Sequence, residues 1–268
     1  MLRLGISTAH QSIEALKRLL EREVVEFIEL GTGESEKSEE AIRNLGRRSI
    51  EFLHGLPFMD FSTRDFMFNP CYKPLEAAMV LDRMVAKASQ LGLEYRFYGV
   101  HAGLLGSIAG PESFTIRDSI EASKGIENLA IFRNNIKEAS KVILENIYGW
   151  DRSARAIGMT QEEMEKMGKH FHLLLDIGHA AINFEMYEGL SLDELRVDNL
   201  PVEEVHLSFL NKSGPPPWDH RGFSETEENL RIVSKLKEVV ELFPDIPVVL
   251  EIGDGERVVE ETVARIWR

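Results

Sequence analysis

Short apolar runs alternate with longer amphipathic segments along the whole chain, a pattern that predicts repeated β–α units. Strands are predicted near residues 2–6, 25–30, 48–54, 95–101, 141–145, 171–176, 203–207 and 247–251. Helices are predicted near residues 11–22, 37–46, 73–91, 125–139, 160–168, 191–197, 225–242 and 255–267. Eight units in this order favour an α/β fold closed as a (β/α)8 TIM barrel, and a doubly wound open sheet is the alternative.

The length of 268 residues suits one such barrel, and no stretch reads as a linker, so a single domain over residues 1–268 is predicted. The first residues lead directly into a strand, and no run approaches the roughly 18 apolar residues that a membrane span needs. Cys71 is the only cysteine, which excludes an intrachain disulfide. We therefore expect a cytoplasmic protein, with no membrane association and no obligate protein partner.

The net charge of −14 disfavours a nucleic-acid partner, because phosphate binding usually leaves a basic footprint on a protein. Bound divalent cations would offset part of this charge inside a pocket. Most of the excess is expected to be an acidic, solvated surface.

Residues that can bind metals end six successive predicted strands. They are His54, His101, Glu145, Asp176, His206 and Glu251. His179 follows Asp176 by three residues, and Asp219 and His220 lie in the loop after His206. An ionisable side chain at the end of a buried strand is costly without a partner, so a run of six predicts a shared site at the carboxyl end of the barrel.

The composition of this set favours a divalent metal. Three carboxylates in one pocket would repel one another, and a bound cation removes that conflict. Histidine nitrogens favour zinc or manganese over calcium, which prefers oxygen ligands. His10, His170 and His172 are interpreted as structural, and Glu29 as a side chain at a solvated loop mouth. Long connections at residues 55–72 and 102–124 leave the same end of the barrel and are expected to be functional.

Short strings at these strand ends resemble the xylose isomerase-like barrels. They are VHAG at 100–103, LENIYG at 144–149, LLDIGHA at 174–180, VHLS at 205–208, WDHRG at 218–222 and VLEIG at 249–253. The resemblance extends from His54 to the end of the chain, and the ligand set is most similar to the endonuclease IV (AP endonuclease family 2) branch. It implies one metal held by Glu145, Asp176, His206 and Glu251.

In the endonuclease branch the resemblance implies a cluster of up to three Zn2+ ions, completed by His54, His101, His179 and the Asp219–His220 pair. That branch separates the aspartate and the histidine by one residue, whereas here they are adjacent, so the sequence leaves open which one is the ligand. Sugar isomerases and epimerases of the superfamily instead use one ion, such as Mn2+, Mg2+ or Co2+, and contact substrate at the position of His179.

Two reactions are therefore expected. A multi-zinc phosphoesterase acting on abasic DNA is ranked first, because a single-metal site has no use for the additional histidines. In that enzyme Glu145 would bridge two ions, Arg221 or Lys212 would clamp a phosphate oxygen, and Trp218 would stack on a base. A sugar or sugar-phosphate isomerase is ranked second, with Glu145 and Glu251 moving a proton between adjacent carbons and His179 contacting substrate. A barrel that binds metal without catalysis is the third hypothesis.

Overall fold

Eight parallel strands close into a barrel in this computed structural model, which describes residues 3–31, 35–59, 68–110, 113–148, 155–211 and 219–267. The barrel strands are β1 (Arg3–Ser7), β2 (Phe27–Leu30), β3 (Ile50–His54), β4 (Phe97–His101), β7 (Val142–Glu145), β8 (His172–Asp176), β9 (Val202–Leu207) and β10 (Pro247–Leu250). Each strand pairs with its neighbours in the chain, and β10 pairs with β1 to close the ring. The predicted (β/α)8 fold is thereby confirmed.

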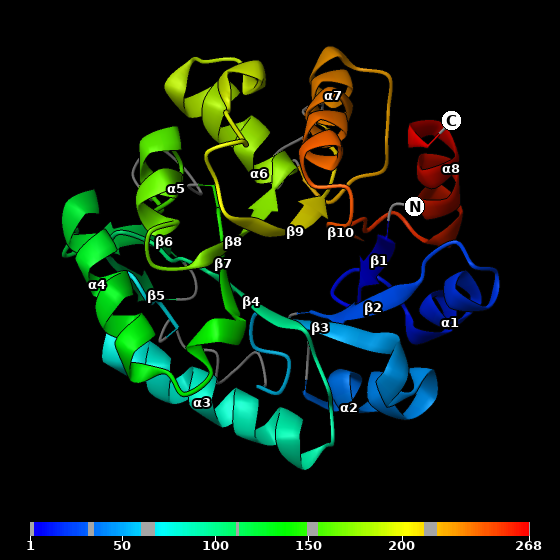
Figure 1. The fold of residues 1–268 in the computed structure, drawn as a ribbon, viewed down its shortest axis with the longest axis horizontal. Helices are drawn as coiled ribbons and strands as arrows, with labels where there is room; N and C mark the ends of the chain where they lie inside the picture. Colours follow the sequence, from blue (N-terminus) through cyan, green and yellow to red (C-terminus); the bar gives the residue numbers. More distant parts are fainter. Residues whose placement is uncertain are drawn as a thin grey trace.

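A helix follows each barrel strand, and Figure 1 shows these helices surrounding the ring of strands. They are α1 (Ile13–Glu21), α2 (Ser35–Leu45), α3 (Pro74–Gln90), α4 (Ala122–Asn135), α5 (Gln161–Met167), α6 (Ile177–Ile182), α7 (Glu227–Leu242) and α8 (Glu256–Ile266). Each helix turns an apolar face toward the strands, as in α1, where Ile13, Leu16 and Leu19 are buried at helical spacing. Among the described residues, no helix has the length and apolar content of a membrane span.

The helix predicted at residues 191–197 is wrong. The sixth unit instead forms α6 immediately after Asp176 and continues as a π-helical turn at Asn183–Glu188. Only a short 3-10 turn at Leu192–Glu194 occupies the predicted segment. The sequence LLDIGHAAI reads as one apolar run, so its periodicity conceals the point where the strand ends and the helix begins.

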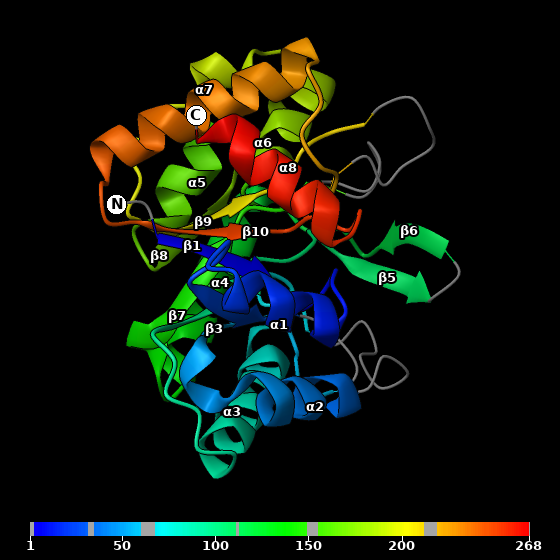
Figure 2. The ribbon, with the colours of Figure 1, turned by 90° about the vertical axis from the view of Figure 1, so that its right-hand side faces the viewer.

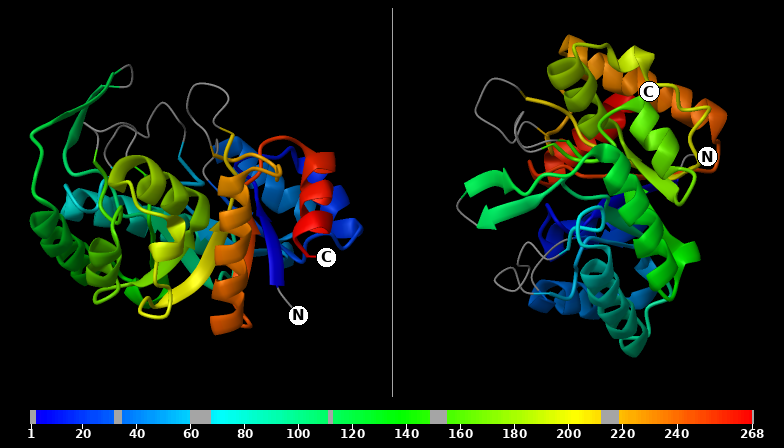
Figure 3. Two further views of the ribbon diagram at one scale, coloured as in Figure 1. Left: turned by 90° about the horizontal axis from the view of Figure 1, so that it is seen from above. Right: turned by 90° about the vertical axis from the view of Figure 1, so that its left-hand side faces the viewer.

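The connection after β4 contains a second small sheet that was predicted only as a long loop. Its strands, β5 (Ser107–Gly110) and β6 (Ser113–Arg117), form an antiparallel pair. Figure 2 and both views of Figure 3 show this hairpin projecting beyond the body of the barrel. Because it extends the chain that leaves His101, the hairpin rises from the same end of the barrel as the predicted site.

The interior of the barrel changes from apolar to polar along its axis. Phe27, Phe52 and Val249 form a separate, fully buried cluster inside the ring, and Gly5 provides space because a side chain there would overlap the Phe27 ring. Inward-facing side chains alternate along each strand, so the next inward position on β2 is Glu29, and on β3 it is His54. The apolar layer therefore supports a layer of ionisable groups.

Candidate metal centre

The predicted strand-end residues meet at the carboxyl end of the barrel, where the described residues form five groups whose donor atoms could share a metal ion. Two of these groups include a residue that was not predicted as a ligand: Glu29 with His54, His206 and Glu251, and His10 with His220 and Glu251. The other three consist of predicted ligands only. We call Glu145, Asp176, His206 and Glu251 the central group. The lateral group consists of His54, His101 and Glu145, and the outer group of His179, Asp219 and His220. Within each group the donor atoms lie within 4.8 Å of one another. All nine residues predicted as ligands therefore belong to at least one group.

Glu145 connects the central and lateral groups because its two oxygens face different histidines. Oε2 lies 2.7 Å from His54 Nε2 and 3.0 Å from His101 Nε2. Oε1 lies 3.2 Å from His179 Nδ1 and 3.8 Å from His206 Nδ1. The carboxylate is fully buried at the end of β7, so both oxygens are directed by the barrel and not by solvent. Such a carboxylate can bridge two cations.

The abrupt start of α6 positions both Asp176 and His179. Asp176 caps the helix, and its Oδ1 accepts a hydrogen bond of 2.7 Å from the backbone N–H of His179. Its Oδ2 is buried and has no hydrogen-bond partner. Asn146 fixes the Asp176 backbone in both directions, donating to its carbonyl at 2.9 Å and accepting from its N–H at 2.8 Å. The free oxygen is thus held toward the central group.

A glycine in β4 creates the space for the His54 ring. A Cβ atom on Gly99 would lie 3.0 Å from His54 Cδ2 and 2.7 Å from Leu174 Cδ1. Both distances are shorter than ordinary carbon contacts, so a larger residue would displace one of these neighbours. His54 therefore reaches Glu145 only because position 99 has no side chain.

The adjacent Asp219 and His220 both reach the outer group because His220 adopts a left-handed backbone conformation, with φ of 57°. Asp219 Oδ2 lies 3.3 Å from His179 Nε2 and 3.1 Å from His220 Nε2. Two backbone hydrogen bonds of 3.2 Å between Phe209 and Arg221 fasten this segment to the end of β9. A left-handed conformation is unfavourable for a residue with a side chain, which is typical of functional sites.

Among the predicted substrate-binding residues, only Arg221 lies in the described part of the chain. Its guanidinium is paired with Asp254 at 3.2 Å and does not line the cavity above the metal-binding groups. Lys212 and Trp218 lie outside the described residues. The cavity has a volume of about 170 Å3. It is lined by His10, His54, His101, Ile147, Tyr148, His179, Asp219, His220 and Glu251.

Three site residues were missed or misplaced from the sequence. Tyr148 lines the cavity, and its hydroxyl lies 3.3 Å from Asp219 Oδ1. His10, interpreted as structural, also lines the cavity and stacks on His220 with ring centroids 4.1 Å apart. The prediction that Glu29 is solvated is wrong, because its side chain is fully buried and lies 2.8 Å from His206 Nε2. Position 29 faces the barrel interior, one residue before β2 ends.

The remaining histidines lie away from the site, as predicted. His172 begins β8 and pairs with Glu203 at 3.3 Å. It lines a wider, open depression of about 470 Å3 that also includes Arg96 and Pro201. This depression is larger than the cavity at the metal-binding groups, but none of those groups borders it.

Without a cation, the histidines and carboxylates of these groups stabilise one another's charged forms. Burial alone would raise the pKa of Glu145, but His101 and His54 hold it well below the usual value. Burial alone would lower the pKa of His206, but Glu29 and Glu251 raise it well above the usual value. The pKa of His179 is raised in the same way, chiefly by Asp176. Burial raises the pKa of Asp176 to about 6. Protonated histidines would thus supply the positive charge that bound metal ions would otherwise supply.

Unpartnered atoms support this view. Glu145 Oε1, Asp176 Oδ2 and His206 Nδ1, all in the central group, are buried without a hydrogen-bond partner. In the outer group, Asp219 Oδ2 and His220 Nδ1 are also buried without a hydrogen-bond partner. Unpartnered buried polar atoms are rare and costly, and a cation would satisfy several of these at once. The donor set of imidazoles and carboxylates therefore fits divalent metal ions.

Comparisons with known proteins agree on the fold. No protein-family model and no curated protein matches the sequence significantly. Among solved structures, the chain is similar to SacUVDE, with a TM-score of 0.57 and 10% identity over 100% of this chain and 98% of that chain. It is similar to the IOLI protein with a bound zinc atom, with a TM-score of 0.59 and 12% identity over 99% and 96% of the chains.

A third similar structure is a xylose isomerase domain protein from Planctomyces limnophilus, with a TM-score of 0.57 and 13% identity over 99% and 95% of the chains. At these identities the similarity concerns the fold. The chain has a (β/α)8 TIM-barrel fold similar to that of the xylose isomerase domain protein, with buried histidine, glutamate and aspartate clusters suited to divalent metals.

Proposed function

We propose that the protein is a phosphodiester hydrolase that uses a cluster of up to three divalent ions, with Zn2+ as the first choice and DNA containing an abasic site as the substrate. The observation that supports this proposal is the presence of three donor groups joined by Glu145. A one-ion enzyme would need the central group alone. The lateral and outer groups add four histidines and an aspartate that such an enzyme would leave without a role.

The ions, when bound, would supply Lewis-acid activation of water and of the phosphoryl oxygens. The chain's own residues would hold the centre and shape its opening. Glu145 would be shared by the central and lateral groups, and Asp219 would be fixed from two sides by His179 and by the Tyr148 hydroxyl. Glu251 would complete the central group, while His10 and Tyr148 would border the space for the scissile group.

A sugar or sugar-phosphate isomerase is the second candidate. The central group alone provides four buried ligands for one Mn2+, Mg2+, Co2+ or Zn2+ ion, and the cavity of about 170 Å3 suits a small substrate. In that reaction Glu145 and Glu251 would be the groups that move the proton, and His179 would contact the sugar. One of the similar structures is a xylose isomerase domain protein.

The ion content of purified protein and the effect of His101→Ala distinguish the two candidates. His101 belongs only to the lateral group, and its side chain is 46% exposed, so its removal should leave the fold and the central group intact. A hydrolase should bind close to three ions, nick duplex DNA at an abasic site, and lose most of its nicking activity in the variant. An isomerase should bind one ion and be nearly insensitive to the change.

His172→Ala is the matched control, because this histidine is 55% exposed and also paired with a glutamate, but lies away from the cavity. It should leave ion content and nicking unchanged. A fully metallated wild-type protein that does not nick abasic DNA would refute the nuclease assignment. One bound ion per chain together with sugar isomerisation would establish the second candidate.

A further inference from the structure

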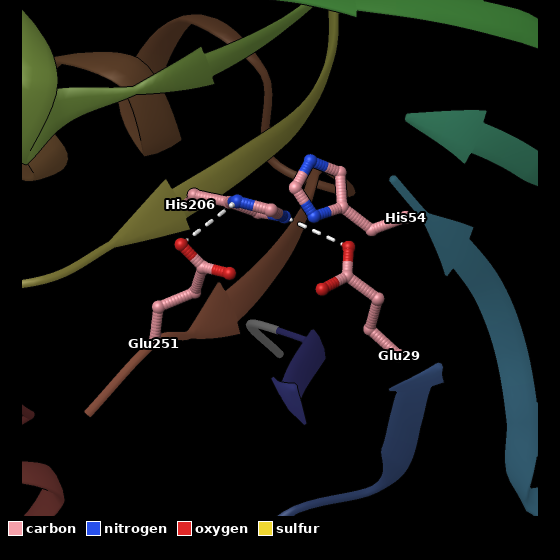
Figure 4. A group of neighbouring side chains, drawn as sticks. All are labelled: Glu29, His54, His206 and Glu251. Carbon is pink, nitrogen blue, oxygen red and sulfur yellow. Dashed lines mark hydrogen bonds and ion pairs between the residues drawn. The ribbon is translucent and has the colours of Figure 1, made fainter. Parts of the chain in front are cut away.

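A buried contact joins Glu29, which was not predicted as a ligand, to His206 of the central group, and both residues also belong to the group that includes His54 and Glu251. Glu29 Oε2 lies 2.8 Å from His206 Nε2, and neither side chain is exposed to solvent. Glu29 comes from β2 and His206 from β9, so the contact crosses the interior of the barrel (Figure 4). Burying a carboxylate there would be costly if it had no partner such as His206.

The two nitrogens of His206 face different partners. Nδ1 lies 3.4 Å from Glu251 Oε2 and 3.8 Å from Glu145 Oε1, both in the central group, and has no hydrogen-bond partner. Nε2 faces Glu29. If Nε2 carries the hydrogen and donates it to Glu29, the lone pair of Nδ1 is left for a cation. Glu29 would therefore select the tautomer that the central group needs.

His54 is in a corresponding position beside the lateral group. Its Nε2 lies 2.7 Å from Glu145 Oε2, whereas its Nδ1 is buried without a hydrogen-bond partner. Figure 4 shows a ring nitrogen of His54 directed toward the Glu29 carboxylate, whose Oε1 is also buried without a partner. Glu29 Oε2 thus faces His206, while Glu29 Oε1 and His54 Nδ1 are each buried without a hydrogen-bond partner.

In the outer group, a backbone carbonyl oxygen plays the part toward His179 that the Glu29 carboxylate plays toward His206. His179 Nδ1 lies 3.0 Å from the carbonyl oxygen of Asn146, an acceptor that requires the hydrogen on Nδ1 and leaves Nε2 to face Asp219. Glu29 supplies from a side chain what the Asn146 carbonyl supplies from the main chain. Glu204 is a weaker candidate, because its nearest oxygen is 3.8 Å from His206 Nε2 and makes no hydrogen bond.

We propose that Glu29 is a positioning residue whose carboxylate receives the Nε2–H group of His206, and so sets the ring orientation and tautomer of the histidine in the central group. This proposal rests on the proposed metal centre. It adds a residue that acts on the central ion site through His206, although its carboxylate also lies within 4.8 Å of donor atoms of His54, His206 and Glu251. Loss of such a partner typically weakens metal affinity about 10–100-fold.

The test compares Glu29→Leu, Glu29→Gln and the wild type by zinc titration and by nitrogen-15 NMR of the histidine rings in the zinc-loaded protein. Leucine removes the acceptor, whereas the glutamine amide oxygen keeps one. Wild type should show His206 with hydrogen on Nε2 and zinc on Nδ1. Glu29→Leu should lose about 10–100-fold in zinc affinity and show a changed His206 pattern. Glu29→Gln should restore the wild-type pattern and most of the affinity.

Glu204→Leu is the matched control, since it removes an equally buried carboxylate close to the same nitrogen of His206. An equal loss of affinity in this variant would mean that the loss of any buried acidic side chain beside His206 has the same effect, which would overturn the specific role of Glu29. Unchanged affinity and an unchanged His206 tautomer in Glu29→Leu would also overturn it, while wild-type zinc binding and nicking would leave the proposed function standing. A wild-type protein that binds no divalent ion would instead overturn the metal centre and, with it, the role of Glu29.

Discussion

Glu145→Gln and Glu204→Gln should have opposite effects on the stability of the metal-free protein. Both residues have fully buried carboxyl groups inside the barrel, and both substitutions conserve shape while removing one ionisable group. Glu145 lies within 3.2 Å of His54, His101 and His179, whereas both oxygens of Glu204 lack a hydrogen-bond partner. Comparing the two substitutions therefore separates the effect of losing ion-pair and hydrogen-bond partners from the effect of burial on stability.

The expected magnitudes follow from these contacts. Removing one member of a buried charge pair costs roughly 3–5 kcal/mol, and the retained amide oxygen of glutamine places Glu145→Gln near the lower figure. At about 2–4 °C per kcal/mol, the melting temperature of the metal-free protein should fall by roughly 6–12 °C. Burial and the nearby Glu29 raise the pKa of Glu204 well above its usual value, which favours the neutral form that glutamine resembles. Glu204→Gln should therefore be neutral or slightly stabilising.

The assay is thermal unfolding in the presence of a chelator, followed by titration of each variant with zinc. Glu145→Gln should bind fewer ions than wild type because the shared oxygens of the central and lateral groups lose their charge. Glu204→Gln should keep the wild-type ion number. We would reject the idea that the histidine partners of Glu145 stabilise the metal-free protein if Glu145→Gln were stable and bound the full number of ions. Equal destabilisation by both substitutions would also refute it.

Three further outcomes are expected. The pKa values of His206 and His179 are raised well above 6.5, which favours the protonated rings when no ion is bound. Zinc binding should therefore release protons, and zinc affinity should rise with pH above 6.5, as calorimetry in buffers of different ionisation enthalpy can measure. Gly99→Ala should cost about 1–3 kcal/mol in unfolding free energy and selectively weaken the lateral ion, because the new Cβ crowds His54; a crystal structure with an unmoved ring would contradict this. Removing the ions with a chelator should lower the free energy of unfolding by about 2.7 kcal/mol, compared with protein at an ion concentration 100 times the Kd. Calorimetric unfolding that the chelator leaves unchanged would argue against a metal site in the folded barrel.

The sequence was sufficient for the architecture and for the residues that meet at the candidate site because both depend on local patterns. Apolar runs of four to six residues mark the strands, and a ligand at or beside the end of a strand must lie at one end of a closed barrel. The start of α6 could not be found this way, because Ile177 and Ala180 continue the apolar run of β8 into a helix. Asp219 and His220 could not be separated either, since the conformation at His220 depends on how the segment is fastened to Phe209.

Glu29 and Glu204 illustrate a different limit. Glu204 precedes His206 by two positions, so strand alternation alone places both side chains on the inward face, and this signal was available in the sequence. The neighbouring Glu203 makes the segment look like a polar, exposed edge, although Glu203 is only partly buried and Glu204 is fully buried. Glu29 has no comparable neighbour on its own strand, and its partner lies 177 residues away on β9. Only barrel closure brings these residues together, so buried acidic groups below the strand ends are harder to predict than the residues at the strand ends themselves.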